Sequence, residues 1–238
     1  MKIMLLGYGK MGKAIENIAL AEGHTITHRI TAESRHELTS YQLGDADVAI
    51  EFTNPESAVS NLEFCLQNHL PVVCGTTGWL QHWEYITRRF QEEKGALFYA
   101  SNYSIGVHIF FEINRLLARW TSMQSSYVPA ITEIHHTEKK DAPSGTALTL
   151  AEGVLSAYSH LRGWQLAPPT SQAYLPITAV RQAAVPGTHV VSYSSAIDTI
   201  EIKHTAHSRE GFARGALQAA IWLQGKQGIF GMQDMLRF

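Results

Sequence analysis

Two imidazoles and a lysine stand close together in the middle of the chain. Residues 133–146 read Glu-Ile-His-His-Thr-Glu-Lys-Lys-Asp-Ala-Pro-Ser-Gly-Thr, which places His135, His136 and Lys139 within five positions. Imidazole and ammonium groups donate protons near neutral pH. The segment therefore offers candidate proton donors for an enzyme.

The end of the same segment is typical of an anion-binding turn. Gly145 and Thr146 open a predicted helix over 145–158. The first N–H groups of a helix and the positive end of its dipole favour a negatively charged group. Proton donors beside such a turn indicate an enzyme that acts on a carboxylate or a phosphate. The alternative is an edge strand with solvent-facing histidines and an ordinary helix N-cap at Ser144.

A glycine-rich turn near the N-terminus supplies a second candidate site. An apolar run over 2–6 leads into Gly7-Tyr8-Gly9-Lys10-Met11-Gly12, and a helical pattern follows over 10–21. In a dinucleotide-binding turn the first glycine permits the tight turn, the second lets the backbone approach the phosphates, and the third lets the helix pack close to the strand. The order strand, turn, helix favours this function over a glycine-rich turn that binds no ligand.

Three further loops follow predicted strands and carry small or hydroxyl side chains. They are Glu51-Phe52-Thr53-Asn54-Pro55, Gly75-Thr76-Thr77-Gly78 and Ala100-Ser101-Asn102-Tyr103-Ser104. Ligands of open α/β sheets bind beyond the carboxyl ends of the strands. These loops could line a nicotinamide ribose and face a substrate, although the same residues also populate ordinary turns.

The elements that must position these residues alternate at first and then change order. Strand patterns at 2–6, 24–30, 47–52, 71–74 and 96–100 alternate with helix patterns at 10–21, 55–67 and 79–93. This alternation predicts an α/β fold with a Rossmann-type parallel sheet.

A long helix at 104–125 then leads to strands at 130–138, 174–182, 188–194 and 199–206, with one helix at 145–158, a loop at 161–173 and a last helix at 211–223. Strands without intervening helices predict a second α+β domain with a mixed or antiparallel sheet. We expect residues 1–103 and 208–238 to form the dinucleotide-binding domain and residues 104–207 the substrate-binding and oligomerisation domain.

Composition narrows the class of protein. The chain has 238 residues, of which 45% are hydrophobic, and a formal net charge of −2. This balance argues against a general role on nucleic acid or a membrane surface, and no apolar stretch is long enough to span a bilayer. Because the first predicted strand starts at residue 2, we expect no signal peptide. The two cysteines, Cys65 and Cys74, are typical of reduced thiols in a cytoplasmic protein.

These motifs together resemble the 4-hydroxy-tetrahydrodipicolinate reductase family, also called dihydrodipicolinate reductase. The resemblance rests on the motifs at 7–12, 51–55, 75–78 and 101–106, and above all on the segment 135–146, in this order over essentially the whole chain. One departure is Glu51, where the family pattern has aspartate. The resemblance implies NAD(P)H-dependent reduction of a cyclic imine with two carboxylates, in lysine and diaminopimelate biosynthesis, by a homotetramer.

The resemblance also implies a role for individual residues. His135 matches the general acid and Lys139 a second proton donor. The positions implied to bind substrate are His136, Gly145, Thr146 and Thr77. The positions implied to bind the cofactor are Gly7, Tyr8, Gly9, Lys10, Met11, Gly12, Gly75, Thr76, Thr77, Ala100, Ser101, Asn102 and Tyr103.

The end of the second strand bears on the choice between NADH and NADPH. An acidic residue there accepts hydrogen bonds from the ribose 2′-hydroxyl and disfavours a 2′-phosphate. The matching position is Thr31, with Arg29 and Arg35 nearby, and arginine suits a phosphate. We therefore expect both cofactors, with NADPH accepted at least as well as NADH. Glu33 opposes this expectation, because a loop shift would return a carboxylate to the ribose.

Three other functions are alternatives. Cys74 lies near the expected nicotinamide position, where a semialdehyde dehydrogenase would carry its nucleophile. A module that binds NAD(P)H without catalysis would not need His135 and Lys139. A metal site is not expected, because adjacent residues of a strand point to opposite faces and His204 and His207 lack a third ligand nearby in the sequence.

Overall fold

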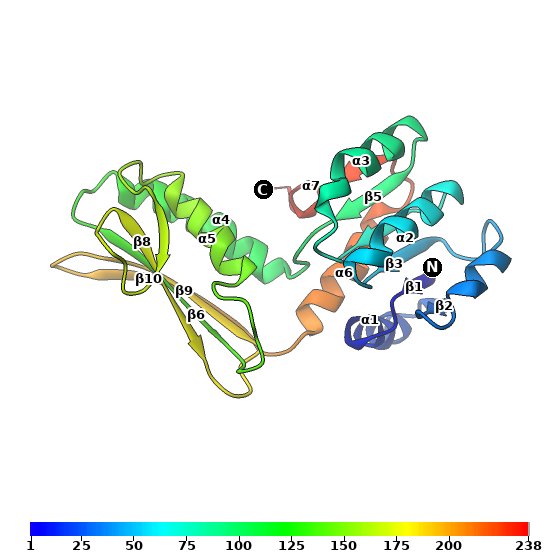
Figure 1. Ribbon diagram of the computed structural model, residues 1–238, viewed down its shortest axis with the longest axis horizontal. Coiled ribbons are helices and arrows are strands. Elements are labelled where there is room, and N and C mark those ends of the chain that lie inside the picture. The colour runs from blue at the N-terminus through cyan, green and yellow to red at the C-terminus, as the bar shows by residue number, and fades with distance from the viewer. Residues whose placement is uncertain (238) are drawn as a thin grey trace. The chain divides into compact units, whose positions relative to one another are not determined.

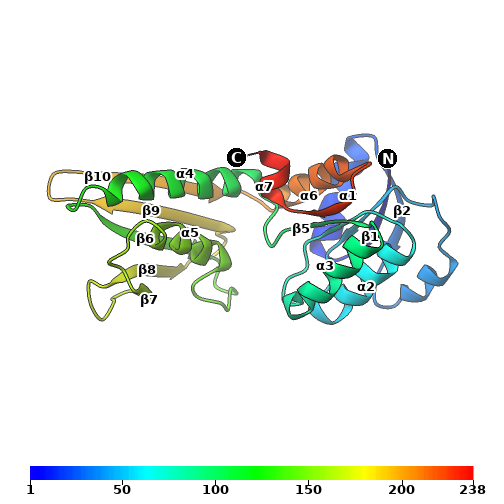
Figure 2. The same ribbon diagram turned by 90° about the horizontal axis from the view of Figure 1, so that it is seen from above.

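The computed structural model describes residues 1–237, which divide into two compact units (Figures 1 and 2). The first unit comprises Met1–Ile105 and Arg209–Phe238, and the second comprises Gly106–Ser208. None of the helices within residues 1–237 combines the length and the apolarity needed to cross a bilayer.

The first unit is built on a sheet of six parallel strands in the order β11-β5-β4-β3-β1-β2. The strands are β1 (Lys2–Leu6), β2 (Thr25–Ile30), β3 (Val48–Glu51), β4 (Val72–Cys74), β5 (Ala96–Tyr99) and β11 (Gly228–Phe230). All the residues of β3 and β4 are buried, and so are all but the first of β1. Continuous apolar runs are typical of parallel strands covered on both faces.

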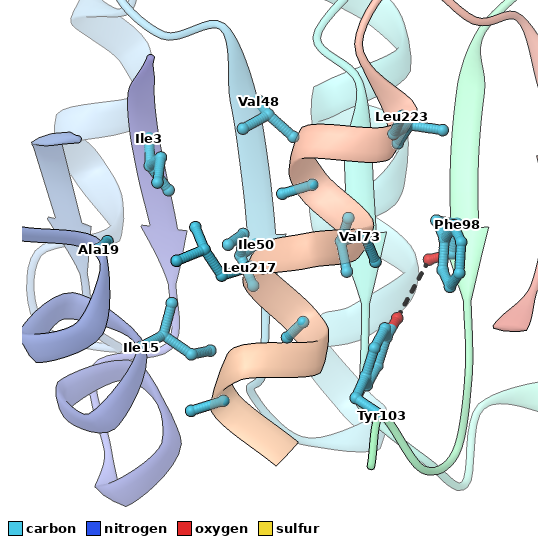
Figure 3. Close-up of a cluster of buried hydrophobic side chains, with 14 of the residues drawn as sticks. Ile3, Ile15, Ala19, Val48, Ile50, Val73, Phe98, Tyr103, Leu217 and Leu223 are labelled. Atoms are coloured by element: carbon cyan, nitrogen blue, oxygen red, sulfur yellow. Dashed lines mark hydrogen bonds between the residues drawn. The ribbon is translucent and has the colours of Figure 1, made fainter. Parts of the chain in front are cut away.

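Helices cover both faces of this sheet. They are α1 (Lys10–Ala21), α2 (Pro55–Gln67), α3 (Trp83–Glu92), α6 (Glu210–Leu223) and α7 (Met232–Leu236), with short 3₁₀ turns η1 (Arg35–Ser40) and η2 (Leu80–His82). Side chains of α1, α6 and α7 form one apolar core with the sheet, and those of α2 and α3 form another. Figure 3 shows the first core, with Leu217 of α6 facing Ile50 of β3.

A glycine lets α6 approach the strand ends closely. A Cβ atom at Gly215 would lie 1.7 Å from the backbone oxygen of Tyr103, so no larger residue fits there. Tyr103 is itself buried, and its hydroxyl donates to the backbone oxygen of Cys74 at 2.7 Å. These contacts fix the chain where it leaves β5.

The second unit is built on a five-stranded mixed sheet in the order β10-β9-β6-β8-β7. The strands are β6 (Val128–His135), β7 (Gly163–Leu166), β8 (Tyr174–Arg181), β9 (Gly187–Ser194) and β10 (Thr199–Ala206). The β6–β8 and β7–β8 pairs are parallel, and the β6–β9 and β9–β10 pairs are antiparallel. Alternate residues of β6 are buried, which is typical of a sheet with one covered face.

Two helices cover that face, α4 (Ile105–Ser122) and α5 (Gly145–Leu155). In Figure 1 they lie beside each other over the sheet. Asn114 of α4 joins the layers, because its amide donates to the backbone oxygen of Leu150 in α5 at 3.0 Å and its oxygen accepts from the Tyr193 hydroxyl of β9 at 3.1 Å.

The predicted fold class, a Rossmann-type parallel sheet with a second mixed sheet, is confirmed. Two local predictions were wrong, because the expected loop over 161–173 contains β7 and the strand expected at 130–138 ends at His135. Beyond residue 223, where no element was predicted, the structure has β11 and α7. The long helix α4 packs on the second sheet together with α5.

Candidate active site

The proton-donor candidates lie where β6 ends. Glu133 and His135 are two residues apart, so both point to the face of the sheet that α4 and α5 cover, and both are buried. His136 is half-buried and begins the connection to α5. His135 therefore belongs to the strand, whereas His136 belongs to the loop that follows it.

Glu133 is fully buried and each of its oxygens has a donor. Oε1 accepts from Nη2 of Arg181 at 3.2 Å, and Oε2 accepts from the backbone N–H of Ser144 at 3.0 Å. Oε2 also lies 3.4 Å from Nδ1 of His135 and 3.8 Å from Nε2 of His189. A buried carboxylate of this kind needs a counter-charge, and Arg181 provides it.

Arg181, at the end of β8, also holds the segment that carries Lys139. Its Nε donates to the backbone oxygen of Lys139 at 3.3 Å, and its Nη2 donates to that of Asp141 at 2.6 Å. The Lys139 ammonium in turn donates to both carboxylate oxygens of Asp141 at 2.8 Å. Lys139 therefore has a partner that an anionic substrate would have to share or replace.

His189 completes the cluster from β9, where it stands opposite Glu133. Its ring meets that of His135 edge to face with centroids 5.0 Å apart, and its Nε2 lies 3.1 Å from the Ser144 hydroxyl. Burial, then the neighbouring charge of His135, lowers the pKa of His189 to about 3. It is therefore a neutral ring near neutral pH.

The pKa of His135 is lowered from its ordinary value by burial, and the nearby Glu133 carboxylate opposes that shift. The cations Lys139 and Arg181 lower it further. Hydrogen bonding from Lys139 lowers the pKa of the Asp141 carboxyl, so this side chain is an anion. The resting cluster is thus poised for His135 to gain a proton when additional negative charge arrives.

The start of α5 has the geometry predicted for an anion-binding turn. The Ser144 hydroxyl caps the helix by accepting from the N–H of Ala147 at 3.2 Å. Gly145 is exposed, and a Cβ placed on it would meet nothing within 4 Å. Thr146 is half-buried beside it. Open space in front of the first turn of an eleven-residue helix suits a carboxylate.

The N-terminal glycine turn fits a dinucleotide. Gly7 has a φ of +95°, and a Cβ there would lie 2.0 Å from the backbone oxygen of Phe52. A Cβ at Gly12 would lie 2.3 Å from the oxygen of Gly7, whereas one at Gly9 would meet nothing within 4 Å. The first and third glycines are therefore needed for packing, and the second leaves the phosphate approach open. No side chain caps the start of α1 at Gly9, where Lys10 and Met11 begin the helix.

The basic residues near β2 are engaged within the first unit. Arg29 pairs with Glu16 of α1, which also accepts from the Tyr8 hydroxyl. Arg35 donates to Asn61 at 2.5 Å and to Ser60 at 2.8 Å, both on α2.

Thr31, the residue matched to the ribose-binding position, donates its hydroxyl to the Glu33 carboxylate at 2.7 Å. A carboxylate thus stands at the end of β2 after all, although it comes from two residues further along the chain.

The remaining cofactor candidates divide into buried and exposed residues. Thr76 is buried, and its hydroxyl accepts from the N–H of Thr53 at 2.8 Å. Ala100 and Tyr103 are also buried, Gly75 and Asn102 are half-buried, and Thr77 and Ser101 are exposed. Among these loop residues, Thr77 and Ser101 are the side chains most available to a ligand.

The structure argues against Cys74 as a nucleophile. Its side chain is fully buried, and its Sγ lies 3.1 Å from Oε2 of Glu51. Burial, then the charge of Glu51, raises the pKa of this thiol well above its ordinary value. A thiol held in its protonated form is a poor nucleophile.

Three members of the cluster were missed from the sequence, namely Glu133, Arg181 and His189. Glu133 could have been found, because it lies two residues before His135 on a strand and hence on the same face. Arg181 and His189 come from other strands, and only the pairing of β6 with β8 and β9 brings them near.

Potential ligand atoms of Glu133, His135 and His189 lie within 4.8 Å of one another, a grouping that the sequence argument about metals did not consider. The carboxylate already serves Arg181 and Ser144. The expectation that the site holds no metal remains a prediction.

The glycine turn and the buried proton-donor cluster define a two-unit oxidoreductase of the dinucleotide-binding class. Models of the dihydrodipicolinate reductase N-terminus and C-terminus match residues 1–103 and 106–236 respectively. The chain belongs to the dihydrodipicolinate reductase family, which confirms the resemblance drawn from its motifs.

Individual relatives agree with this assignment. The 4-hydroxy-tetrahydrodipicolinate reductase of Christiangramia forsetii is 46% identical over 237 residues, covering 99% of this chain and 98% of the relative. That of Desulfovibrio desulfuricans is 34% identical, covering 95% of each. The fold is similar to that of dipicolinate-bound dihydrodipicolinate reductase from Paenisporosarcina sp. TG-14, with a TM-score of 0.78, 20% identity and 99% of both chains covered.

Proposed function

We propose that this chain catalyses the NAD(P)H-dependent reduction of 4-hydroxy-tetrahydrodipicolinate or dihydrodipicolinate to tetrahydrodipicolinate, with His135 as the proton donor. The enzyme is a reductase of its family, and the reaction belongs to lysine and diaminopimelate biosynthesis. The observation that carries the proposal is the placement of buried His135, the Lys139 segment and the open start of α5 around one carboxylate, Glu133.

The first unit holds the cofactor, either NADPH or NADH. The pyrophosphate lies against the backbone of the glycine turn and the start of α1, because the second glycine leaves that approach open. Thr77 and Ser101 are exposed on the loops after β4 and β5, where the nicotinamide half binds. The bound cofactor supplies the hydride, and the protein supplies binding and orientation.

The second unit binds the dicarboxylate. Gly145 and Thr146 hold one carboxylate through the first N–H groups of α5 and the threonine hydroxyl, since the space before them is open. Lys139 and His136 bind the rest of the anion, and the Lys139 ammonium transfers from Asp141 to substrate. Charge-assisted contacts of this kind contribute about 1.5–3 kcal/mol each.

His135 then delivers a proton. From the 4-hydroxy substrate, the hydroxyl must first be lost as water to give the conjugated dihydro ring. Hydride addition to that ring leaves an enamine-like species that must be protonated on carbon. An imidazolium beside a carboxylate can supply that proton, and bound substrate carboxylates favour the imidazolium form by their charge. Lys139 acts as the second donor, within reach of the same anion.

We also propose that the enzyme is a homotetramer assembled through the second unit. In the described chain, α4 and α5 pack on one face of the second sheet, and no helix packs on the other. Val128 of β6 and Val180 of β8 lie on that other face and are exposed. An uncovered sheet face with exposed valines suits association with a second copy.

We place the enzyme in the cytoplasm. Cys65 and Cys74 are both buried and free, and a reducing compartment keeps them so.

The test of the proposed function is oxidation of NADPH or NADH followed by absorbance, with substrate freshly generated by the preceding synthase. We expect turnover that depends on both the cofactor and the dicarboxylate. A folded protein that binds NADPH but never oxidises it with this substrate would instead be the non-catalytic binding module.

A further inference from the structure

We propose that Glu133 is a positioning residue for His135: it holds the ring with Nδ1–H directed at its own carboxylate, so that Nε2 is the atom that delivers the proton. The inference rests on the proposed function, because it assigns a partner to the general acid. It concerns Glu133, which the sequence motifs did not single out.

The first support is the placement of the two ring nitrogens. Nδ1 of His135 is buried and has no well-formed hydrogen bond, and Oε2 of Glu133 lies 3.4 Å from it. Gly187 lies beside Nε2, and a Cβ added there would lie 3.1 Å from that nitrogen, so the glycine leaves more room next to it. A carboxylate faces one nitrogen, and the other is left for a ligand.

The second support is electrostatic. Among residues 1–237, the titratable groups that act electrostatically on this ring include Glu133, Lys139, Asp141, Arg181 and His189. His189 is neutral, and Lys139 is paired with Asp141. Glu133 is the anion in direct contact with the ring, and Arg181 compensates its burial. Protonation of Nε2 therefore creates an imidazolium that Glu133 stabilises, and proton transfer to substrate leaves the neutral Nδ1–H form.

The third support is that Glu133 joins the ring to the rest of the site. Its Oε2 accepts from Ser144, the N-cap of α5, immediately before the proposed carboxylate-binding pair. Its Oε1 binds Arg181, which fastens the backbone oxygens of Lys139 and Asp141. One carboxylate thus sets the relative positions of the proton donor, the lysine segment and the anion-binding turn.

Glu133→Gln tests this role with little change of shape. An amide has one acceptor oxygen, so Arg181 or Ser144 loses its acceptor, and the amide nitrogen can face Nδ1. We expect kcat to fall at least about tenfold, and by no more than the roughly 10²–10⁴-fold that a general acid supplies. The alkaline limb of the rate profile moves to lower pH, because loss of the carboxylate disfavours the imidazolium. Glu138→Gln, an exposed change in the same segment, is the matched control.

A second measurement separates this role from a merely structural one and needs no turnover. Histidine side-chain NMR of the intact protein, with His135 assigned from the spectrum of His135→Gln, reports which nitrogen is protonated in the neutral ring. We expect the Nδ1–H form in wild type, in Glu138→Gln and in Glu133→Asp, which keeps the charge. We expect its loss in Glu133→Gln.

Each result of the kcat and NMR measurements either supports or overturns the role of Glu133. An Nε2–H form of neutral His135 in wild type overturns the inference, even if Glu133→Gln does not fold. An unchanged tautomer in folded Glu133→Gln, or an unchanged kcat, overturns it as well. If wild type does not turn over the substrate, the proposed function fails, whereas the NMR result still decides the Glu133–His135 contact.

Discussion

Replacing His135 by glutamine removes the proposed proton donor and keeps a side chain of similar length. General acid catalysis contributes about 10²–10⁴-fold, or about 3–5 kcal/mol of barrier at roughly 1.4 kcal/mol per tenfold. Only 9% of the His135 side chain is exposed, so water has little access to replace it. We therefore expect kcat to fall by about 10²–10⁴-fold, with a smaller change in KM.

The assay is initial-rate oxidation of NADPH across a range of pH. Burial lowers the pKa of His135 below its usual value of 6.5 in the free protein. Because the acid must be protonated, kcat/KM is fully developed below that lowered pKa and falls as pH rises through it. His135→Gln should lose this limb, and His160→Gln, an exposed histidine of the same unit, should keep it. A near wild-type kcat in His135→Gln refutes the assignment.

Four further predictions concern substrate, cofactor, assembly and stability. Thr146→Val removes a carboxylate contact worth roughly 1.5–3 kcal/mol and should therefore raise KM for the dicarboxylate about tenfold or more. An unchanged KM would show that Thr146 does not bind the substrate. NADPH should be used at least as well as NADH, and Arg35→Ala should lower kcat/KM for NADPH selectively. A tenfold NADH preference that Arg35→Ala leaves unaltered contradicts this. Light scattering at micromolar concentration should give a tetramer, and a monomer refutes the proposed sheet interface. Because the pKa of His189 in the folded protein is about 3, its contribution to stability is present above pH 6.5 and is lost as pH falls toward 3. The free energy of unfolding in urea should therefore depend less on pH in His189→Gln than in wild type over this window. An equal pH dependence in the two proteins contradicts the claim.

The structure weakens the expectation that NADPH is accepted at least as well as NADH. Arg29 and Arg35 suggested a phosphate site, yet Arg29 pairs with Glu16 and Arg35 with residues of α2. Glu33 stands beside Thr31 instead. For NADPH to be favoured, Arg35 must exchange its contacts with Asn61 and Ser60 for the 2′-phosphate. This is why the Arg35→Ala comparison is informative.

The sequence predicted those parts of the fold that have strong local signals. The buried runs of β1, β3 and β4 are apolar enough to indicate parallel strands covered on both faces. The helix patterns of α1 and α2 also indicate where each helix begins and ends. β7 escaped because Pro168 and Pro169 made its surroundings read as a loop, and pairing with β8 supplies what local propensity lacks. β11 has only three residues, too few for a periodic pattern.

The candidate site shows the same division. His135, Lys139 and the start of α5 lie in one continuous segment, so their types and spacing indicated proton transfer to an anion. Arg181 and His189 reach Glu133 from β8 and β9, more than forty positions away, through sheet pairing. Only the register of a mixed sheet determines that contact, and no local pattern encodes it.

The most direct test of the central claim is the fate of a deuterium placed at C4 of the nicotinamide in NADPH. With synthase-generated dicarboxylate and the wild-type protein, we predict a tetrahydrodipicolinate product one mass unit heavier than with unlabelled cofactor, formed in step with cofactor oxidation. The label is placed on each face of the nicotinamide in turn. A product that carries the label from neither face, or oxidation of the cofactor without product, would contradict reduction by direct hydride transfer.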